Sequence, residues 1–234
     1  MDKSAKQLGR RMLSVYRQLE PKLEEAAAQA NVTCKKGCAS CCYLQIYVSL
    51  PEAVALAEQI GKDPKHTAEV LKKCYEQLPK LNPDNALHFK QMLPCVLLDE
   101  ETKTCTAYEA RPTACRHHYV VSPASNCSPL AENTEIERLN LEKVDAFVLG
   151  ESLRVLKQHQ LPALLAPIPV ALLWAFRLLA EGEVKFIDTL SSKEDYGLMD
   201  IRRWTAQALA AVEATTTEAN QPPVEDTTVE GSNG

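Results

Sequence analysis

Four cysteines within nine residues constrain this chain more than any other feature of its sequence. They lie in the run CKKGCASCC, at Cys34, Cys38, Cys41 and Cys42. Close spacing lets one short loop direct several thiolates at one point, and Gly37 can supply the backbone turn that such a loop needs. Zinc takes four tetrahedral ligands, and iron-sulfur clusters are also held by cysteine thiolates from closely spaced positions. The run therefore predicts a site for zinc or iron, with an iron-sulfur cluster as one form of the iron.

A second set of cysteines follows further along the chain, at Cys95, Cys105, Cys115 and Cys127. Two short β-favouring runs, 95–98 and 104–108, flank a polar stretch, which predicts a small hairpin. Such a hairpin would bring Cys95 close to Cys105. Eight thiolates suit two four-cysteine sites, or one site with additional redox or shared ligands. Both arrangements remain open at this point.

Basic residues surround the cysteines. Arg111 and Arg116 flank Cys115 and are predicted to support the metal ligands from outside, by donating hydrogen bonds to backbone carbonyls or to an acidic partner. The alternative is that either arginine is a surface charge. Lys35 and Lys36 interleave with the first cluster and can lower thiol pKa values or simply face solvent.

Three further residues can be interpreted in two ways. His117 and His118 follow Cys115 and can act as additional ligands, because imidazole suits zinc and iron, or have an ordinary loop role. Cys74 falls on an apolar helix face, which favours a small core residue over a ligand.

The cellular setting is predicted to be cytoplasmic. The first twenty residues carry charges throughout and lack the apolar core of a secretory signal. Nine cysteines in a reducing compartment are better candidates for metal ligands or redox thiols than for structural disulfides. Five acidic residues after position 212 account for the net charge of -5, and the rest of the chain is balanced. We therefore expect no nucleic-acid partner.

The fold is predicted to be mainly α. Apolar residues recur at steps of three or four over 8–23, where Pro21 is expected to bend or restart the helix. An S-x-x-E capping box begins a helix at Ser49 that ends at Gly61, and Asp63 begins another that stops before Pro79. Residues 132–158 and 192–212 are also predicted to be helical.

Four segments follow from this pattern. They are an N-terminal helical segment at 1–33, a cysteine cluster domain at 34–130, a C-terminal helical part packed on it at 131–212, and a disordered acidic tail at 213–234. The apolar run 161–176 contains three prolines and meets Arg177 before it reaches membrane-spanning length. It is interpreted as a buried core segment, so no membrane partner is expected.

The cysteine pattern resembles a known family, the YkgJ-like cysteine cluster proteins, whose domain is described as zinc- or iron-chelating and carries a CxxCxxCC or CKKGCxxCC run. The family continues with a cysteine before a leucine-aspartate turn, a cysteine, a tyrosine, an Arg-Pro pair and a Cys-Arg pair. In this chain the matching residues are Cys95, Leu98-Asp99, Cys105, Tyr108, Arg111-Pro112 and Cys115-Arg116. The resemblance covers about residues 34–127 and implies that eight cysteines serve the metal, with Cys127 as the eighth.

Several functions fit this pattern. The first is a metal-binding protein with a redox, sensing or metal-handling role. The second comes from a distant similarity to flagellin lysine N-methylases, which implies an S-adenosylmethionine-dependent protein methyltransferase, although the chain contains no glycine-rich G-x-G loop. A third is a purely structural zinc module. The cysteine spacing also coincides with that of radical S-adenosylmethionine enzymes, but capped helices replace their barrel. Enzyme status and protein partners stay open.

Overall fold

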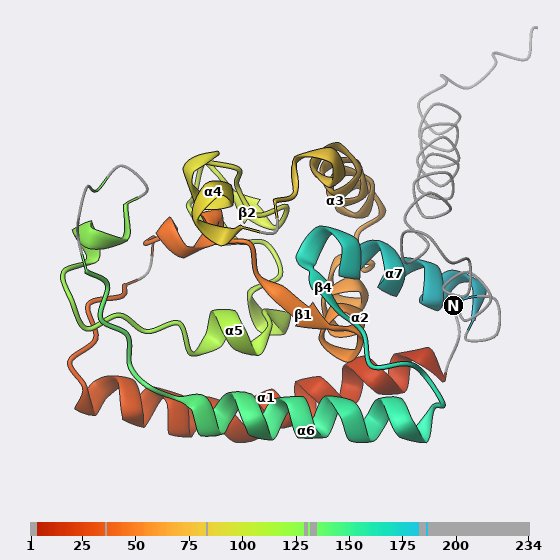
Figure 1. The fold of residues 1–234 in the computed structure, drawn as a ribbon. Coiled ribbons are helices and arrows are strands. Elements are labelled where there is room, and N and C mark those ends of the chain that lie inside the picture. The colour runs from red at the N-terminus through yellow and green to blue at the C-terminus, as the bar shows by residue number, and fades with distance from the viewer. Residues whose placement is uncertain are drawn as a thin grey trace, which may run out of the picture.

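The computed structural model describes residues 4–35, 37–82, 84–128, 131, 135–182 and 186. This part of the chain contains seven α-helices and two small antiparallel sheets (Figure 1). The helices are α1 Ala5–Gln29, α2 Leu50–Ile60, α3 Pro64–Gln77, α4 Asn85–Lys90, α5 Thr113–Arg116, α6 Glu142–Gln158 and α7 Ile168–Glu181. The strands are β1 Tyr47–Ser49, β2 Leu98–Asp99, β3 Thr104–Cys105 and β4 Leu165–Pro167. The predicted mainly α fold with a small hairpin is confirmed.

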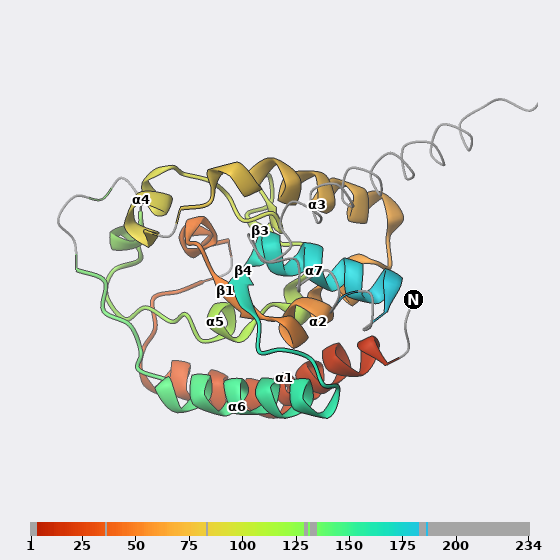
Figure 2. The same cartoon turned by 45° about the vertical axis from the view of Figure 1, so that its right-hand side comes forward.

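Helices α1 and α6 lie side by side along one edge of the molecule, as both ribbon views show (Figures 1 and 2). The buried face of α1 includes Leu8, Met12 and Leu23, which follow the predicted spacing. Pro21 lies inside α1, and the helix continues on both sides of it. A helix was predicted over 132–158, but α6 begins only at Glu142. The prediction is therefore wrong for residues 135–141, which are not helical.

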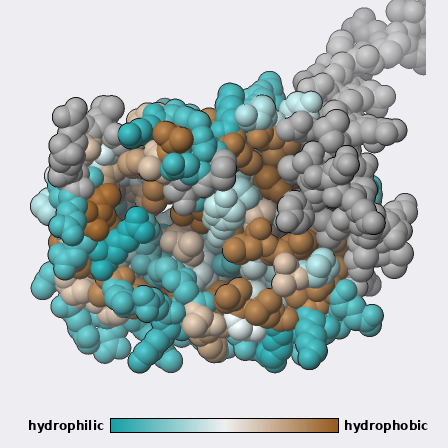
Figure 3. All heavy atoms as spheres, viewed as in Figure 1, coloured by the Kyte–Doolittle hydropathy of each residue, from teal (hydrophilic) through white to brown (hydrophobic). Residues whose placement is uncertain are grey.

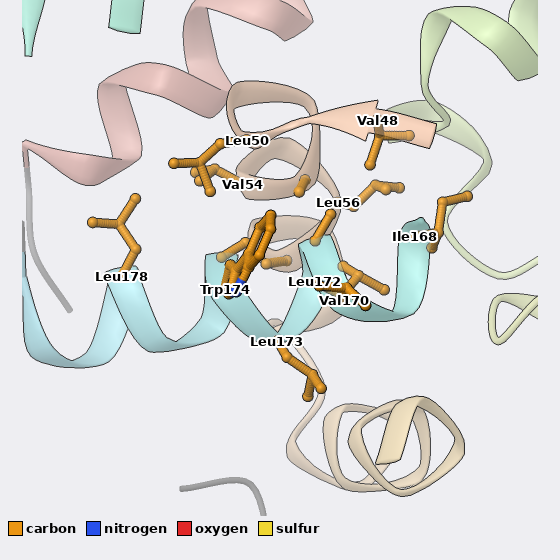
Figure 4. Packing of buried hydrophobic residues seen from close by; sticks show 14 of the residues in the cluster. Val48, Leu50, Val54, Leu56, Ile168, Val170, Leu172, Leu173, Trp174 and Leu178 are labelled. Atoms are coloured by element: carbon orange, nitrogen blue, oxygen red, sulfur yellow. The ribbon is translucent and has the colours of Figure 1, made fainter. Parts of the chain in front are cut away.

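Helix α2 lies at the centre of the molecule, between α1 and α7. Its capping box is present as predicted, because the Ser49 amide and hydroxyl both donate to the Glu52 carboxylate. All but two of its residues are buried. α7 covers one side of α2 with a dense set of apolar side chains that includes Leu172 and Trp174 (Figure 4). Because α2 is apolar nearly all round, it can be stable only when it is buried between other helices.

Gly9 lies where α1 packs directly against the backbone of α2. A Cβ added there would lie 2.9 Å from the backbone nitrogen of Ala55 and 2.8 Å from Oε2 of Glu58. The backbone of α2 is held in the core on its other side and has no room to move away.

Replacing Gly9 with alanine is therefore expected to lower the free energy of unfolding by about 1–3 kcal/mol through overpacking. Gly150 is the matched control, because it also lies within a helix, α6, but an added Cβ there meets nothing within 4 Å. The change Gly150→Ala should raise the free energy of unfolding by about 0.5–1 kcal/mol through helix propensity. Urea unfolding of both variants measures the difference, and equal effects would contradict this account of the α1–α2 contact.

The apolar run 161–176 covers a short loop, β4 and the first nine residues of α7. β4 pairs with β1 in the register Val48 opposite Ala166, which joins two segments more than a hundred residues apart. The expectation of a buried core segment is confirmed for α7, whereas Leu165 in β4 is 60% exposed. Apolar side chains come to the surface in this part of the molecule, whereas hydrophilic and apolar side chains are mixed along the edge formed by α1 and α6 (Figure 3). No helix within the described residues is both long and apolar enough to span a membrane.

The main hydrophobic core draws on three of the four predicted segments. It includes Leu8 from 1–33, Leu56 from 34–130 and Leu172 from 131–212. Cys74 is fully buried in this core, as predicted. The predicted helix at 192–212 and the tail at 213–234 lie outside the described residues.

Candidate metal centre

The first cysteine cluster follows α1 and forms a tight loop. Gly37 has a φ of 85°, a conformation that L side chains rarely adopt, and it allows the chain to turn between the first two cysteines. The amide of Cys38 donates to the carbonyl of Lys35 at 3.0 Å. A short 3-10 helix, Ser40–Tyr43, then carries Cys41 and Cys42. Sequence spacing predicted this turn, and the structure contains it.

The second cysteine set reaches the first through the backbone. The amide of Cys95 donates to the carbonyl of Cys42 at 2.7 Å, which fixes the two segments together. Downstream, β2 and β3 pair with Leu98 opposite Cys105. Burial raises the pKa of the Cys95 thiol to about 12, and the charge of Cys105 adds to that increase. The hairpin thus brings Cys95 and Cys105 within electrostatic range of each other, as predicted.

Cys115 approaches the same place from α5. Burial raises the pKa of its thiol, and the nearby thiolates of Cys95, Cys41 and Cys105 raise it further. Cys42 interacts with the same neighbours, because Cys95 and Cys115 both raise its pKa. We refer to Cys42, Cys95, Cys105 and Cys115 as the hairpin group. Its members come from three separate chain segments.

A second group forms where residues 33–34 run beside 118–122. The amide of Thr33 donates to the carbonyl of Val120 at 2.8 Å, and the amide of Val120 donates to Sγ of Cys34 at 3.3 Å. Cys127 follows in the 3-10 helix Ala124–Cys127. Burial raises its pKa, and so do the charges of Cys34 and Cys38. We refer to Cys34, Cys38 and Cys127 as the loop group.

Cys41 lies between the two groups. Its charge raises the pKa values of thiols in both, including Cys34, Cys115 and Cys127. A hydrogen bond from the Cys42 thiol lowers the pKa of Cys41 to about 7, and Arg111 contributes to the lowering. The same hydrogen bond raises the pKa of Cys42. Within this pair, Cys41 therefore ionises more readily than Cys42.

The thiols approach one another without converging on a single point. Among the described residues, no set of three or more His, Cys, Asp or Glu side chains has a geometry that holds a metal ion. The Cys34 thiol makes a hydrogen bond to the backbone instead: its Sγ donates to the carbonyl of His118 at 3.7 Å. The donor chemistry fits zinc or iron, because all nine cysteines are free and all but Cys74 are partly exposed. Ligation would require the thiol side chains to rotate.

The two arginines near Cys115 are anchored within the protein. Nε of Arg116 donates to the carbonyl of Arg111 at 2.8 Å, and its other nitrogens donate to Glu20 and to the carbonyl of Glu109. The guanidinium of Arg111 lies 3.5 Å from Glu20 and 3.9 Å from the centre of the Tyr108 ring. Neither arginine extends freely into solvent. Both make contacts of the kind expected from the sequence.

The histidines next to Cys115 face different surroundings. Nε2 of His117 lies 2.6 Å from Oδ1 of Asp145 on α6. Burial lowers the pKa of His118 to about 4, with further lowering by Arg138 and His117, so its imidazole is neutral at physiological pH. His117 is thus engaged by an acidic side chain, and His118 carries no charge beside the loop group.

Sequence reasoning missed two residues that hold this region together. Glu52 was interpreted as a helix cap, yet it also bonds to α1 and α5, as described below. Arg138 is close enough to lower the pKa values of Cys41 and Cys127. Its position follows from the bridge between Val120 and Arg138, which no local sequence pattern announces.

Comparisons with known proteins give one match. No curated protein and no solved structure matches this chain. Residues 33–141, somewhat less than half of the chain, match the model of the CxxCxxCC family, described as a putative zinc- or iron-chelating domain, and this stretch contains every cysteine of the hairpin and loop groups.

Proposed function

We propose that this protein binds zinc or iron at two neighbouring four-cysteine sites. One site uses the hairpin group, Cys42, Cys95, Cys105 and Cys115. The other uses the loop group together with Cys41, that is Cys34, Cys38, Cys41 and Cys127. Two four-thiolate sites satisfy the coordination number that zinc prefers, and four thiolates equally suit an iron-sulfur cluster.

The observation that carries this proposal is the electrostatic coupling of thiols from distant segments. Cys95 and Cys105 raise the pKa of Cys115, Cys34 and Cys38 raise that of Cys127, and Cys41 raises both. Ordinary core packing gives no reason for eight thiols to gather in this way, because a free cysteine in a core behaves as a small apolar residue. The division also matches the backbone links, which join Cys95 to Cys42 and Thr33 to Val120.

The charges around the thiols favour an anionic centre. Four thiolates around a divalent ion leave a net negative charge that basic neighbours stabilise. Arg111 and Arg138 both lower the pKa of Cys41, and Arg116 acts on Cys105. When bound, zinc would cross-link these segments, and iron would add electron transfer. The chain's own contribution is to gather the thiols and to stabilise their deprotonated state.

A redox, sensing or metal-handling role fits better than a purely structural one. The main core forms around α2 and α7. From the cysteine-bearing loops it takes Val96, Leu97, Ala107 and Ala110, and no described residue of 30–45 or 111–128 belongs to it. A metal that served only to fasten helices together would therefore add little to the body. The cysteine residues of the loop group are also partly exposed, which leaves that site open to exchange with other molecules.

Metal analysis with an absorption spectrum, on protein purified without oxygen, tests the proposal. Titration with cobalt, a spectroscopic substitute for zinc, should show thiolate bands that saturate at two ions per chain. Cys115→Ser and Cys127→Ser should each remove one ion, and Cys74→Ser, at a buried core thiol, should remove none. Absence of thiolate bands in the wild-type protein would refute metal binding. Loss of both ions in each variant would instead indicate a single shared site.

A further inference from the structure

A buried carboxylate at the centre of the molecule joins α2 to the helix that carries Cys115. Glu52 is 7% exposed. Each of its two carboxylate oxygens accepts two hydrogen bonds. Oε2 accepts from the amide of Ser49 at 3.0 Å and from its hydroxyl at 2.8 Å. Oε1 accepts from the hydroxyl of Tyr16 on α1 at 2.9 Å and from the amide of Thr113 on α5 at 2.9 Å.

An ordinary capping box uses only part of this capacity. Its glutamate needs one oxygen to reach back to the residue before the helix, and the other oxygen is left to water. Here the second oxygen is turned inward and bonds to residues 36 and 61 positions away. A buried carboxylate is costly unless its oxygens are fully hydrogen-bonded. The arrangement therefore indicates that Glu52 has a second structural role besides capping α2.

This second role of Glu52 is to hold the beginning of α5. This helix has only four residues, Thr113–Arg116, which is too short to be stable through its own hydrogen bonds. Its position must come from tertiary contacts. Glu52 holds the first amide of α5, at Thr113, and the Arg116 side chain holds its end. Cys115 lies between these two anchors.

We infer that Glu52 is a positioning residue for Cys115, and that it sets this thiol in register with the hairpin group. The inference rests on the proposed metal-binding function. Loss of the Thr113 bond would free the beginning of α5 and let Cys115 move by the small distances that matter for ligation. Partners outside the ligand shell contribute about 10–100-fold to metal affinity in other proteins, and a similar loss is expected here.

Two substitutions separate positioning from capping. Glu52→Asp keeps the charge and can still reach its own helix start, but its side chain is one methylene shorter and cannot also reach Thr113. Glu52→Gln has a single acceptor oxygen, so either α5 or Ser49 loses its partner. Tyr16→Phe is the matched control, because it removes one hydrogen bond to the same oxygen and leaves the Thr113 bond in place.

The experiment combines cobalt titration with thiol labelling in the metal-free state. In Glu52→Asp, cobalt affinity at the hairpin group should fall by about 10–100-fold, while the second ion binds as in the wild type. Glu52→Gln should show this loss only where its amide oxygen turns to Ser49 and leaves Thr113. Iodoacetamide should label Cys115 faster in Glu52→Asp, with buried Cys74 as the internal reference. Tyr16→Phe should leave both measurements unchanged. Circular dichroism on each variant verifies that the helices are retained.

The outcomes distinguish this inference from the proposed function. If the wild type gives no thiolate bands with cobalt, metal binding is refuted and the positioning role falls with it. If the wild type binds two ions and Glu52→Asp binds them equally well, with unchanged labelling of Cys115, only the positioning role is overturned. A loss of both ions, or faster labelling at Cys74 as well, would indicate a general structural effect and would also overturn it.

Discussion

Removal of bound metal with a chelator is expected to loosen the cysteine-bearing loops and to leave the helical body folded. The ligands come from separate segments, and metal binding is coupled to folding in such cases. Residues 30–45 and 111–128 should therefore lose protection against hydrogen exchange, because no described residue of these two stretches belongs to the main core. α2 and α3 lie between these two stretches in the sequence, but they should keep their protection. The reason is that Leu56 and Leu71 are buried in the main core.

Hydrogen exchange followed by mass spectrometry, on metal-loaded and chelated protein, measures this effect peptide by peptide. Peptides from α2 and α7 provide the internal control, since both helices pack in the core. The variant Cys115→Ser supplies a second control, because part of the loosening should already be present before the chelator is added. Equal protection of the cysteine loops in both samples would contradict metal-dependent folding.

Local patterns were sufficient to predict much of the helical framework. The capping box at Ser49 and Glu52 gave the start of α2, and Asp63 with Pro64 gave the start of α3. In both cases a side chain satisfies amides that the helix itself leaves free, so the signal lies within a few residues. The β2–β3 hairpin was predictable for the same reason, because its strands flank one polar turn.

Long-range contacts were not predictable in this way. Pairing of β1 with β4 joins segments that no local signal connects. Of the two effects expected of Pro21, a restart of the helix does not occur. α1 continues through this residue, and Leu19 and Leu23 are buried on either side of it. The residues before α6 lacked a boundary signal strong enough to show that the helix begins only at Glu142.

The candidate site illustrates the same limit. Cysteine spacing indicated which residues could bind metal, but left open one site or two. The grouping depends on which segments lie side by side, and that is fixed by the amide of Cys95 on Cys42 and by the bridge near Val120. Glu52 was visible in the sequence as a cap, and only the fold revealed that its other oxygen reaches Thr113.

Arg116 is expected to make the largest side-chain contribution to stability near the site. Its side chain is 7% exposed, donates to Glu20 and to the carbonyls of Arg111 and Glu109, and lies over the ring of Tyr16. Glu20 keeps Arg111 as a second cationic partner at 3.5 Å and is itself 30% exposed, so its loss is partly relieved. The carbonyls of Arg111 and Glu109 lose their bonds with Arg116 outright.

The substitution Arg116→Met should therefore lower the free energy of unfolding by about 2–4 kcal/mol, because it leaves partly buried acceptors unsatisfied. Arg116→Lys should recover only part of this loss, since an ammonium cannot reach three separate acceptors as the planar guanidinium does. Arg11 provides the matched control: it also pairs with a glutamate, but its side chain is 39% exposed, so Arg11→Met should cost about 0–1 kcal/mol. Urea unfolding of the metal-free proteins compares the three variants without any contribution from metal binding. If Arg116→Met proved no more destabilising than Arg11→Met, Arg116 would contribute no more to the free energy of unfolding than an exposed arginine does. The segment that carries Cys115 would then have to be held by Glu52 and the metal alone.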